Sequence, residues 1–219
     1  MIRGTLPDVE GFLGRGIHVQ SDHEEQPRSN VEIRRCLIDS NHEFGLLFAA
    51  ADAIVESTAV RGTRPNVEGF LGRGIHVERH GEGSGRSSVV ISESVLEENS
   101  EAGLFIAESD AVIVATSIRG VSSAPSNQLG DGVVVYAENA PASAIISAVR
   151  VEQSERAAIS NFGGTVELQS SLLLCNGLDL STQRLAMYGG ILRDRGGNRC
   201  GCPEPSETCE MADEPITAP

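Results

Sequence analysis

The stretch RGTLPDVEGFLGRGIHV at residues 3–19 returns as RGTRPNVEGFLGRGIHV at residues 61–77, an offset of 58 residues. Only two positions differ between the copies. Self-similarity at a fixed offset is typical of repeat proteins, because each unit buries its apolar face against its neighbour. The duplication therefore predicts a solenoid of stacked units.

Five glycines mark a shorter period inside the long one. They recur every 29 residues, and each precedes a short apolar run: Gly16, Gly45, Gly74, Gly103 and Gly132. A second block after each run carries two apolar columns five residues apart. The first column is Ile33, Val55, Ile91, Ile113, Ile146 and Leu168, and the second is Ile38, Val60, Leu96, Ile118, Val151 and Leu173. Short β-branched runs broken by glycine and turn residues favour strands over helices.

The spacing between the glycines and the first column defines the coil. It is 17 residues after Gly16 and 10 residues after Gly45, so a seven-residue insertion alternates between two corners. Removing the insertion leaves a basic coil of 22 residues, enough for a few short strands and tight corners. Polar residues three positions after the second column, Asn41 and Asn99 among them, predict a hydrogen-bonded ladder at one corner.

With its Asn-x-x-x-Gly-apolar-x-apolar and apolar-x-apolar blocks, the chain resembles the right-handed parallel β-helix repeat family, the pectate-lyase-like solenoids of secreted bacterial proteins. The resemblance covers roughly residues 2 to 180. It implies an all-β fold: a right-handed parallel β-helix of about six coils at residues 1–180, followed by a cysteine-containing cap and tail at residues 181–219. Handedness is implied by the resemblance alone. Such folds host lyases, hydrolases, epimerases, adhesins and inert spacers, so no single activity follows.

A column of charged residues tests the register of the coils. The residue after the second apolar column alternates in sign along the chain, with Arg3 in front: Asp39, Arg61, Glu97, Arg119 and Glu152. On parallel strands about 4.8 Å apart, such residues would face one another. The sequence therefore predicts a ladder of ion pairs, with Asp39 beside Arg61.

Composition limits the classes of partner. Aromatic residues make up 4% of the chain and Trp is absent, so the core must consist of aliphatic side chains. A net charge of −14 argues against nucleic acid and anionic membranes as partners. No apolar run of about 18 residues is present, so no membrane span is expected. The chain opens in the middle of a coil, and we expect a leader and upstream coils of a longer parent chain.

Four cysteines lie close together near the end of the chain: Cys175, Cys200, Cys202 and Cys209. They predict a disulfide-bonded cap, for which three pairings are open. A metal site is the alternative, but the paired CxxC spacing of zinc sites is lacking and no histidine lies nearby. Disulfides favour an extracellular or cell-surface location. Cys36, which shares a column with small polar residues, is expected to be a buried thiol.

Two loops of the odd coils, at residues 20–29 and 78–87, supply the candidate ligand-binding residues. With the outward histidines of the preceding strands they bring nine polar side chains to one flank: His18, Asp22, His23, Glu24, Glu25, His76, Glu78, His80 and Glu82. Acids there could bind Ca²⁺ or act on glycosidic bonds. The alternative is a solvated acidic loop. Apart from Ca²⁺ no cofactor is expected, and the metal remains open.

Loops of the opposite corner are nearly identical in two coils. They could be a repeated binding element that uses Phe12, Phe70, Arg15 and Arg73, or they could record a recent duplication. For enzymes, the family resemblance implies a carboxylate cluster on exposed strand positions. The corresponding column lacks it, since it reads His18, Leu47, His76, Phe105 and Val134.

The sequence thus favours a non-catalytic extracellular β-helix repeat module rather than an enzyme. We expect a surface or structural role, with binding of glycans or cations through the loops and a polysaccharide or another cell-surface component as the partner. The alternative is a polysaccharide lyase, hydrolase or epimerase of the pectate-lyase-like superfamily, with its chemistry in the acidic loops or in further coils.

Overall fold

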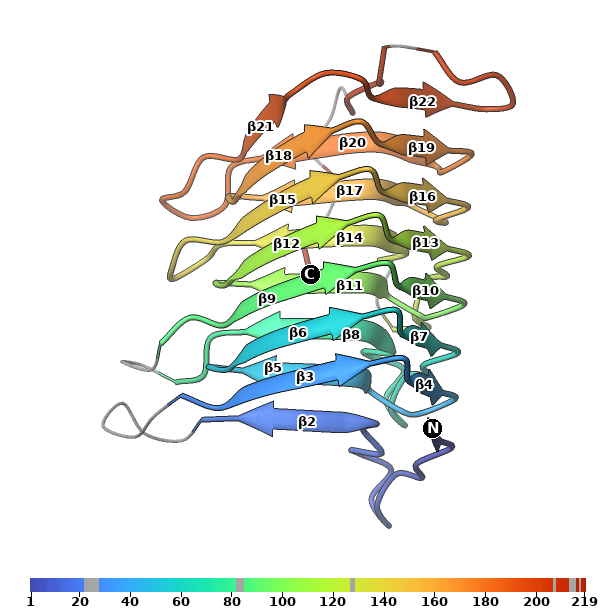
Figure 1. Cartoon of the computed structure of the whole chain (residues 1–219), viewed down its shortest axis with the longest axis vertical. Helices are drawn as coiled ribbons and strands as arrows, with labels where there is room; N and C mark the ends of the chain where they lie inside the picture. Colours follow the sequence, from blue (N-terminus) through green and yellow to red (C-terminus); the bar gives the residue numbers. More distant parts are fainter. Residues whose placement is uncertain (22–27, 82–84, 127–128, 207, 213–215, 217) are drawn as a thin grey trace.

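The structure is a computed structural model that describes residues 1–21, 28–81, 85–126, 129–206, 208–212, 216 and 218–219. Its strands form three parallel sheets arranged around one axis, along which the coils stack (Figure 1). Within the described ranges there is no helix long and apolar enough to cross a membrane.

Each sheet takes every third strand of the chain. Sheet A contains β1 (Ile2–Arg3), β4 (Leu37–Asp39), β7 (Ala59–Arg61), β10 (Val95–Glu97), β13 (Ser117–Arg119), β16 (Arg150–Glu152), β19 (Leu172–Leu174) and β22 (Arg199–Gly201). Sheet B contains β2 (Ile17–Gln20), β5 (Phe44–Ala49), β8 (Arg73–Glu78), β11 (Ala102–Ala107), β14 (Asp131–Tyr136), β17 (Ala157–Phe162) and β20 (Leu178–Gln183). Sheet C contains β3 (Asn30–Arg34), β6 (Asp52–Glu56), β9 (Ser88–Ser92), β12 (Asp110–Val114), β15 (Ser143–Ser147), β18 (Thr165–Gln169) and β21 (Ile191–Asp194).

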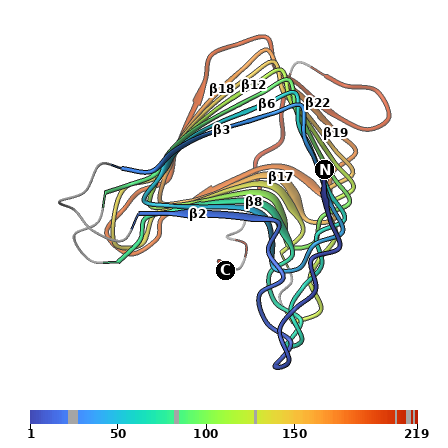
Figure 2. The same ribbon diagram turned by 60° about the horizontal axis from the view of Figure 1, so that its bottom comes forward.

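The chain passes from sheet B to sheet C to sheet A and then climbs to the next coil. In Figure 1 the nearer strands of sheet C run from left to right as the chain rises, which makes the coil right-handed. Figure 2 shows that the coils superimpose along the axis and that longer loops leave the stack at two of its corners. The all-β right-handed parallel β-helix expected from the sequence is confirmed.

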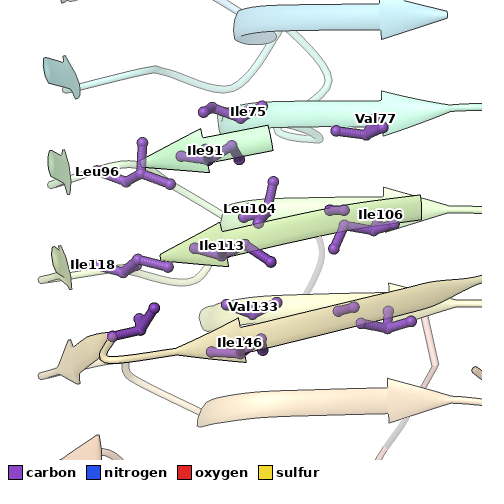
Figure 3. Packing of buried hydrophobic residues seen from close by; sticks show 14 of the residues in the cluster. Ile75, Val77, Ile91, Leu96, Leu104, Ile106, Ile113, Ile118, Val133 and Ile146 are labelled. Atoms are coloured by element: carbon purple, nitrogen blue, oxygen red, sulfur yellow. The ribbon is translucent and has the colours of Figure 1, made fainter. Parts of the chain in front are cut away.

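The core consists of the two apolar columns and the inward residues of sheet B. Register pairs Ile91 with Ile113 and Ile113 with Ile146, one residue per coil (Figure 3). The second column pairs Val60 with Leu96 in the same way. All of these side chains are buried. The coil alignment made from the sequence is therefore confirmed.

The repeated glycines are needed where sheet B begins. A Cβ on Gly45 would meet Cγ1 of Val60, and a Cβ on Gly103 would meet Cγ2 of Ile118. All five repeated glycines share a second contact: a Cβ at each would meet a backbone carbonyl of the next coil, such as that of Gly103 above Gly74. Because this carbonyl contact recurs once per coil, the glycine recurs with the same period.

The ladder of ion pairs lies on sheet A. Asp39 Oδ2 is 2.8 Å from Arg3 Nε and Asp39 Oδ1 is 3.1 Å from Arg61 Nε, while Arg61 Nη1 is 3.7 Å from Glu97 Oε1. Burial alone would raise the pKa of Asp39, but hydrogen bonds from Arg61 and Ser40 and the charges of both arginines outweigh it and lower the pKa. The predicted neighbours do face one another.

Polar side chains at the corner form the expected second ladder. Asn99 Oδ1 accepts a hydrogen bond from Thr63 N at 3.1 Å, and Asn176 Oδ1 accepts one from Ser154 N at 2.9 Å. Cys36 is a free thiol, as expected, but it is only partly buried rather than buried. It follows β3, the edge strand of sheet C, which has a neighbouring strand on one side only.

The last coil lies beyond the point where the sequence pattern fades. After residue 180, strands β21 and β22 extend sheets C and A to Gly201. Two disulfides fasten this coil: Cys175–Cys202 and Cys200–Cys209. The expected disulfide cap is confirmed, and its connectivity is one of the three that the sequence left open.

Candidate functional site

The outer face of sheet B begins with a row of ion pairs. Three arginines at or just before the starts of its strands each bind an acid at or just before the start of a neighbouring strand. We call these contacts the edge ion pairs: Arg15–Glu43, Arg73–Glu101 and Arg156–Asp131. The Nε to carboxylate distances are 3.1, 2.9 and 2.9 Å respectively. Each guanidinium also lies over an aromatic ring: Phe44, Phe105 and Phe162.

The second edge ion pair is almost completely buried. The side chains of Arg73 and Glu101 are 11% and 1% exposed. The guanidinium carbon of Arg73 lies 3.6 Å from the centre of the Phe105 ring. Arg73 is thus held between a carboxylate and an aromatic face, an arrangement that strengthens a desolvated cation–π contact.

His76 continues this network along β8. Its Nδ1 lies 2.7 Å from Arg73 Nη1, and its Nε2 lies 3.0 Å from Glu78 Oε2. Arginine can only donate and an ionised carboxylate can only accept, so these partners assign a neutral imidazole with its proton on Nε2. Both ring nitrogens are therefore engaged.

Burial sets the charge states of this network. Desolvation and the charge of Arg73 lower the pKa of His76, against the opposing effect of Glu78. Burial would raise the pKa of Glu78, but the hydrogen bond from His76 and the charge of Arg73 outweigh it and lower the pKa. The stable state at neutral pH is Arg73⁺, neutral His76 and Glu78⁻.

The first repeat contains the same arginine and histidine in a more open setting, with Gln20 at the position of Glu78. Arg15 Nη1 lies 3.3 Å from His18 Nδ1, and His18 is exposed. Burial and the charge of Arg15 still lower the pKa of His18. Leu47 lies between His18 and His76 in the register, so the two histidines are two coils apart.

The remaining predicted residues divide into two groups. His80 Nε2 lies 3.0 Å from Gln20 Nε2, which joins the two odd-coil loops at the flank where Glu78 lies. His18, His76, Glu78 and His80 are thus brought to one flank, as expected. The others lie outside the described residues: Asp22, His23, Glu24, Glu25 and Glu82. Among the described residues, no three His, Cys, Asp or Glu side chains gather as a metal-binding group.

Sequence reasoning missed the acids that hold the arginines. Glu43 and Glu101 each lie 28 residues after their arginine. This common offset, together with the RGIH motif, was the available signal. Arg15 and Arg73, which the sequence placed in a repeated binding loop, are used in these internal ion pairs.

A separate cavity of about 500 Å³ lies beside the disulfides at the end of the solenoid. Asp179, Glu204 and Glu210 contribute acids to its lining. Burial raises the pKa of Asp179, whose Oδ2 accepts a hydrogen bond from Glu210 N at 3.1 Å. The cavity is lined by residues 175–179, which include the start of β20, together with cap residues between 200 and 212.

No family model and no curated protein matches the chain. Among solved structures, two trypsin-treated forms of QnrB1, a plasmid-mediated fluoroquinolone resistance protein, are similar at 11% and 12% sequence identity. The alignments cover 78% and 84% of this chain and 91% of each QnrB1 chain, with a TM-score of 0.14 in both cases. The three sheets described above define the class of the protein: it is a parallel β-helix solenoid.

Proposed function

We propose that the chain is a non-catalytic extracellular solenoid module with a structural or surface role, of the pectate-lyase-like type in its coils. The observation that carries the proposal is that the acids along sheet B are engaged in ion pairs and hydrogen bonds with neighbouring side chains. Glu43, Glu101 and Asp131 neutralise the edge arginines, and Glu78 accepts a hydrogen bond from His76. These carboxylates hold side chains in place, whereas a glycosidic reaction needs an acid and a base free to exchange protons.

Two further features support a structural module in an oxidising compartment. The ladder of ion pairs on sheet A specifies the register of the coils, and the disulfides fasten the last coil to the one before. Disulfides persist mainly in secreted and surface proteins. The loops at residues 20–29 and 78–87 remain the proposed binding elements for glycans or cations.

The test is a screen of polygalacturonate and alginate, each with and without CaCl₂. We expect binding without release of unsaturated or reducing ends. The natural protein is compared with the double variant Glu24→Gln/Glu25→Gln. The variant should bind these polysaccharides more weakly in CaCl₂ if the acidic loop holds the cation. Turnover by the natural sequence that this variant abolishes would instead establish the alternative, a polysaccharide lyase, hydrolase or epimerase.

A further inference from the structure

Three large apolar side chains on the outer face of sheet B are buried although they point away from the core. Phe105 alternates along its strand with the core residues Leu104 and Ile106, and Val134 and Phe162 are likewise directed outward. Their exposed fractions are 3% for Phe105 and 0% for Val134 and Phe162. A second apolar cluster therefore lies outside the solenoid, and something covers it.

The cover includes the end of the chain. Ile216 and Ala218 pack against the outer cluster, together with Leu185. The side-chain amide of Gln183 donates a hydrogen bond of 2.7 Å to the carbonyl oxygen of Ile216. Figure 2 shows the C-terminus outside the coil, beside the strands of sheet B. We call Ile216 and Ala218 the C-terminal latch.

The segment that leads to the latch is fixed to the last coil. Cys209 is bonded to Cys200, and Met211 forms a parallel bridge with Leu180. Leu180 N donates to Glu210 O at 3.2 Å, and Ala212 N donates to Leu180 O at 2.9 Å. Because the latch begins next to sheet B, its effective concentration over the outer cluster is high.

The rings of the outer face favour a peptide over a sugar. Ring centres are 4.9 Å apart for Phe44 and His76, 5.2 Å for His76 and Phe105, and 6.1 Å for Phe105 and Tyr136. The planes of His76 and Phe105 are nearly parallel, at 8°, so these rings cover one another's faces. Arg73 lies over the Phe105 ring as well. Ring edges and aliphatic groups then remain for a ligand, which suits small apolar side chains.

We propose that the outer face of sheet B around Phe105, Val134 and Phe162 is a peptide-binding surface, and that the C-terminal latch is its ligand within the same molecule. The partner that fits the surface is a short apolar peptide with a free backbone carbonyl for Gln183. The proposal is independent of any ligand bound by the acidic loops.

The test uses the full chain with the substitution Ile216→Asp and a fluorescent peptide with the sequence of residues 213–219. The natural protein should bind the peptide weakly, since the latch competes from within the molecule. The variant should bind it at least about tenfold more tightly and should also increase the fluorescence of an apolar dye. A peptide carrying the same aspartate should not bind.

Two controls make the result decisive. Ile145→Asp changes an apolar residue, 48% exposed, on the outer face of sheet C and should alter neither readout. Ala218→Asp, a second latch variant, should reproduce the effect of Ile216→Asp. The proposal is overturned if both latch variants keep the circular dichroism of the natural protein and neither exposes dye-binding surface nor gains affinity for the peptide.

Discussion

Arg73 organises the outer face of sheet B at the scale of one residue. It binds Glu101, approaches His76 and covers the Phe105 ring. Replacing it with alanine leaves a buried carboxylate without its partner. We expect Arg73→Ala to lower the free energy of unfolding by about 3–5 kcal/mol, as measured by urea denaturation.

A matched arginine on sheet A provides the comparison. Arg119 binds Glu97, but its side chain is 52% exposed. Exposed ion pairs contribute little to stability. Arg119→Ala should therefore leave the urea midpoint nearly unchanged, and equal losses for the two variants would contradict the assignment of Arg73.

His76 should make stability depend on pH. Burial and Arg73 lower its pKa below the ordinary value of 6.5, so the unfolded chain binds more protons below that value. Stability contributed by neutral His76 is present above 6.5 and is lost as pH falls toward the lower folded pKa. The charged groups that face it are Arg73, Glu78 and Glu101.

We expect the urea concentration at the unfolding midpoint to decrease as the pH is lowered from about 7.5 to about 5.5. The decrease should be smaller in His76→Gln. Carboxylates with lowered pKa values, among them Asp39 and Glu78, lose their contributions only at lower pH. His42→Gln, which changes a histidine outside this network, is the control. An unchanged pH dependence in His76→Gln would show that His76 is not the titrating group.

The sequence predicted on which flank the candidate site lies, but it did not predict that His76 would be buried there. Alternation along the strand correctly directed His76 outward, away from the core. Its cover comes from Phe44 and Phe105 on neighbouring coils, and the distant C-terminal latch packs on the outer cluster to which Phe105 belongs. Periodicity identifies which side of a strand a residue occupies, but it carries no information on what later folds over that side.

At the scale of the element, the glycines that open sheet B carry a prediction. A Cβ on Gly103 would meet Ile118 and the carbonyl of Gly132. Overpacking at such a position costs about 1–3 kcal/mol. Gly103→Ala should lower the free energy of unfolding by this amount, whereas Gly189→Ala, whose Cβ would have nothing within 4 Å, should be close to neutral.

The strands that the sequence predicted best are those with periodic apolar columns. Ile113 and Ile118 could be aligned with their neighbours without any structure, because each lies in a column repeated once per coil. The last coil escaped prediction, since β20 carries Ser181 and Thr182 and β21 ends in charged residues. In the last coil, the disulfides and the packing of the C-terminal latch hold the strands where the periodic apolar core ends.

At the scale of the whole molecule, the two disulfides should differ in their effect. Cys175–Cys202 closes a separation of 27 residues and joins the ends of β19 and β22, whereas Cys200–Cys209 spans 9 residues within the cap. Loss of a native disulfide costs about 2–4 kcal/mol, and the longer loop contributes about 1 kcal/mol more. Cys175→Ser/Cys202→Ser should therefore be the less stable double variant.

Hydrogen exchange should show where this loss occurs. Each coil contacts mainly its neighbours, so the last coil can open without the others. Amides of β20 and β22 should exchange faster in Cys175→Ser/Cys202→Ser, while those of β8 and β11 should keep their protection. Uniform acceleration along the chain would instead indicate that the solenoid unfolds as one unit.

The alternating charges on sheet A impose a parity rule on the length of the molecule. Acid and base exchange places from one coil to the next, and the loop insertions exchange corners with the same period of two. Loss of a single coil would place Arg61 beside Arg119 or Asp39 beside Glu97, and would also set unlike loops on one another. Loss of a 58-residue pair of coils would preserve both patterns. From β1 to β16, where the charges alternate, the register therefore favours growth or loss of coils in even steps. The rule ends at Glu152, which faces Leu174 on the next coil.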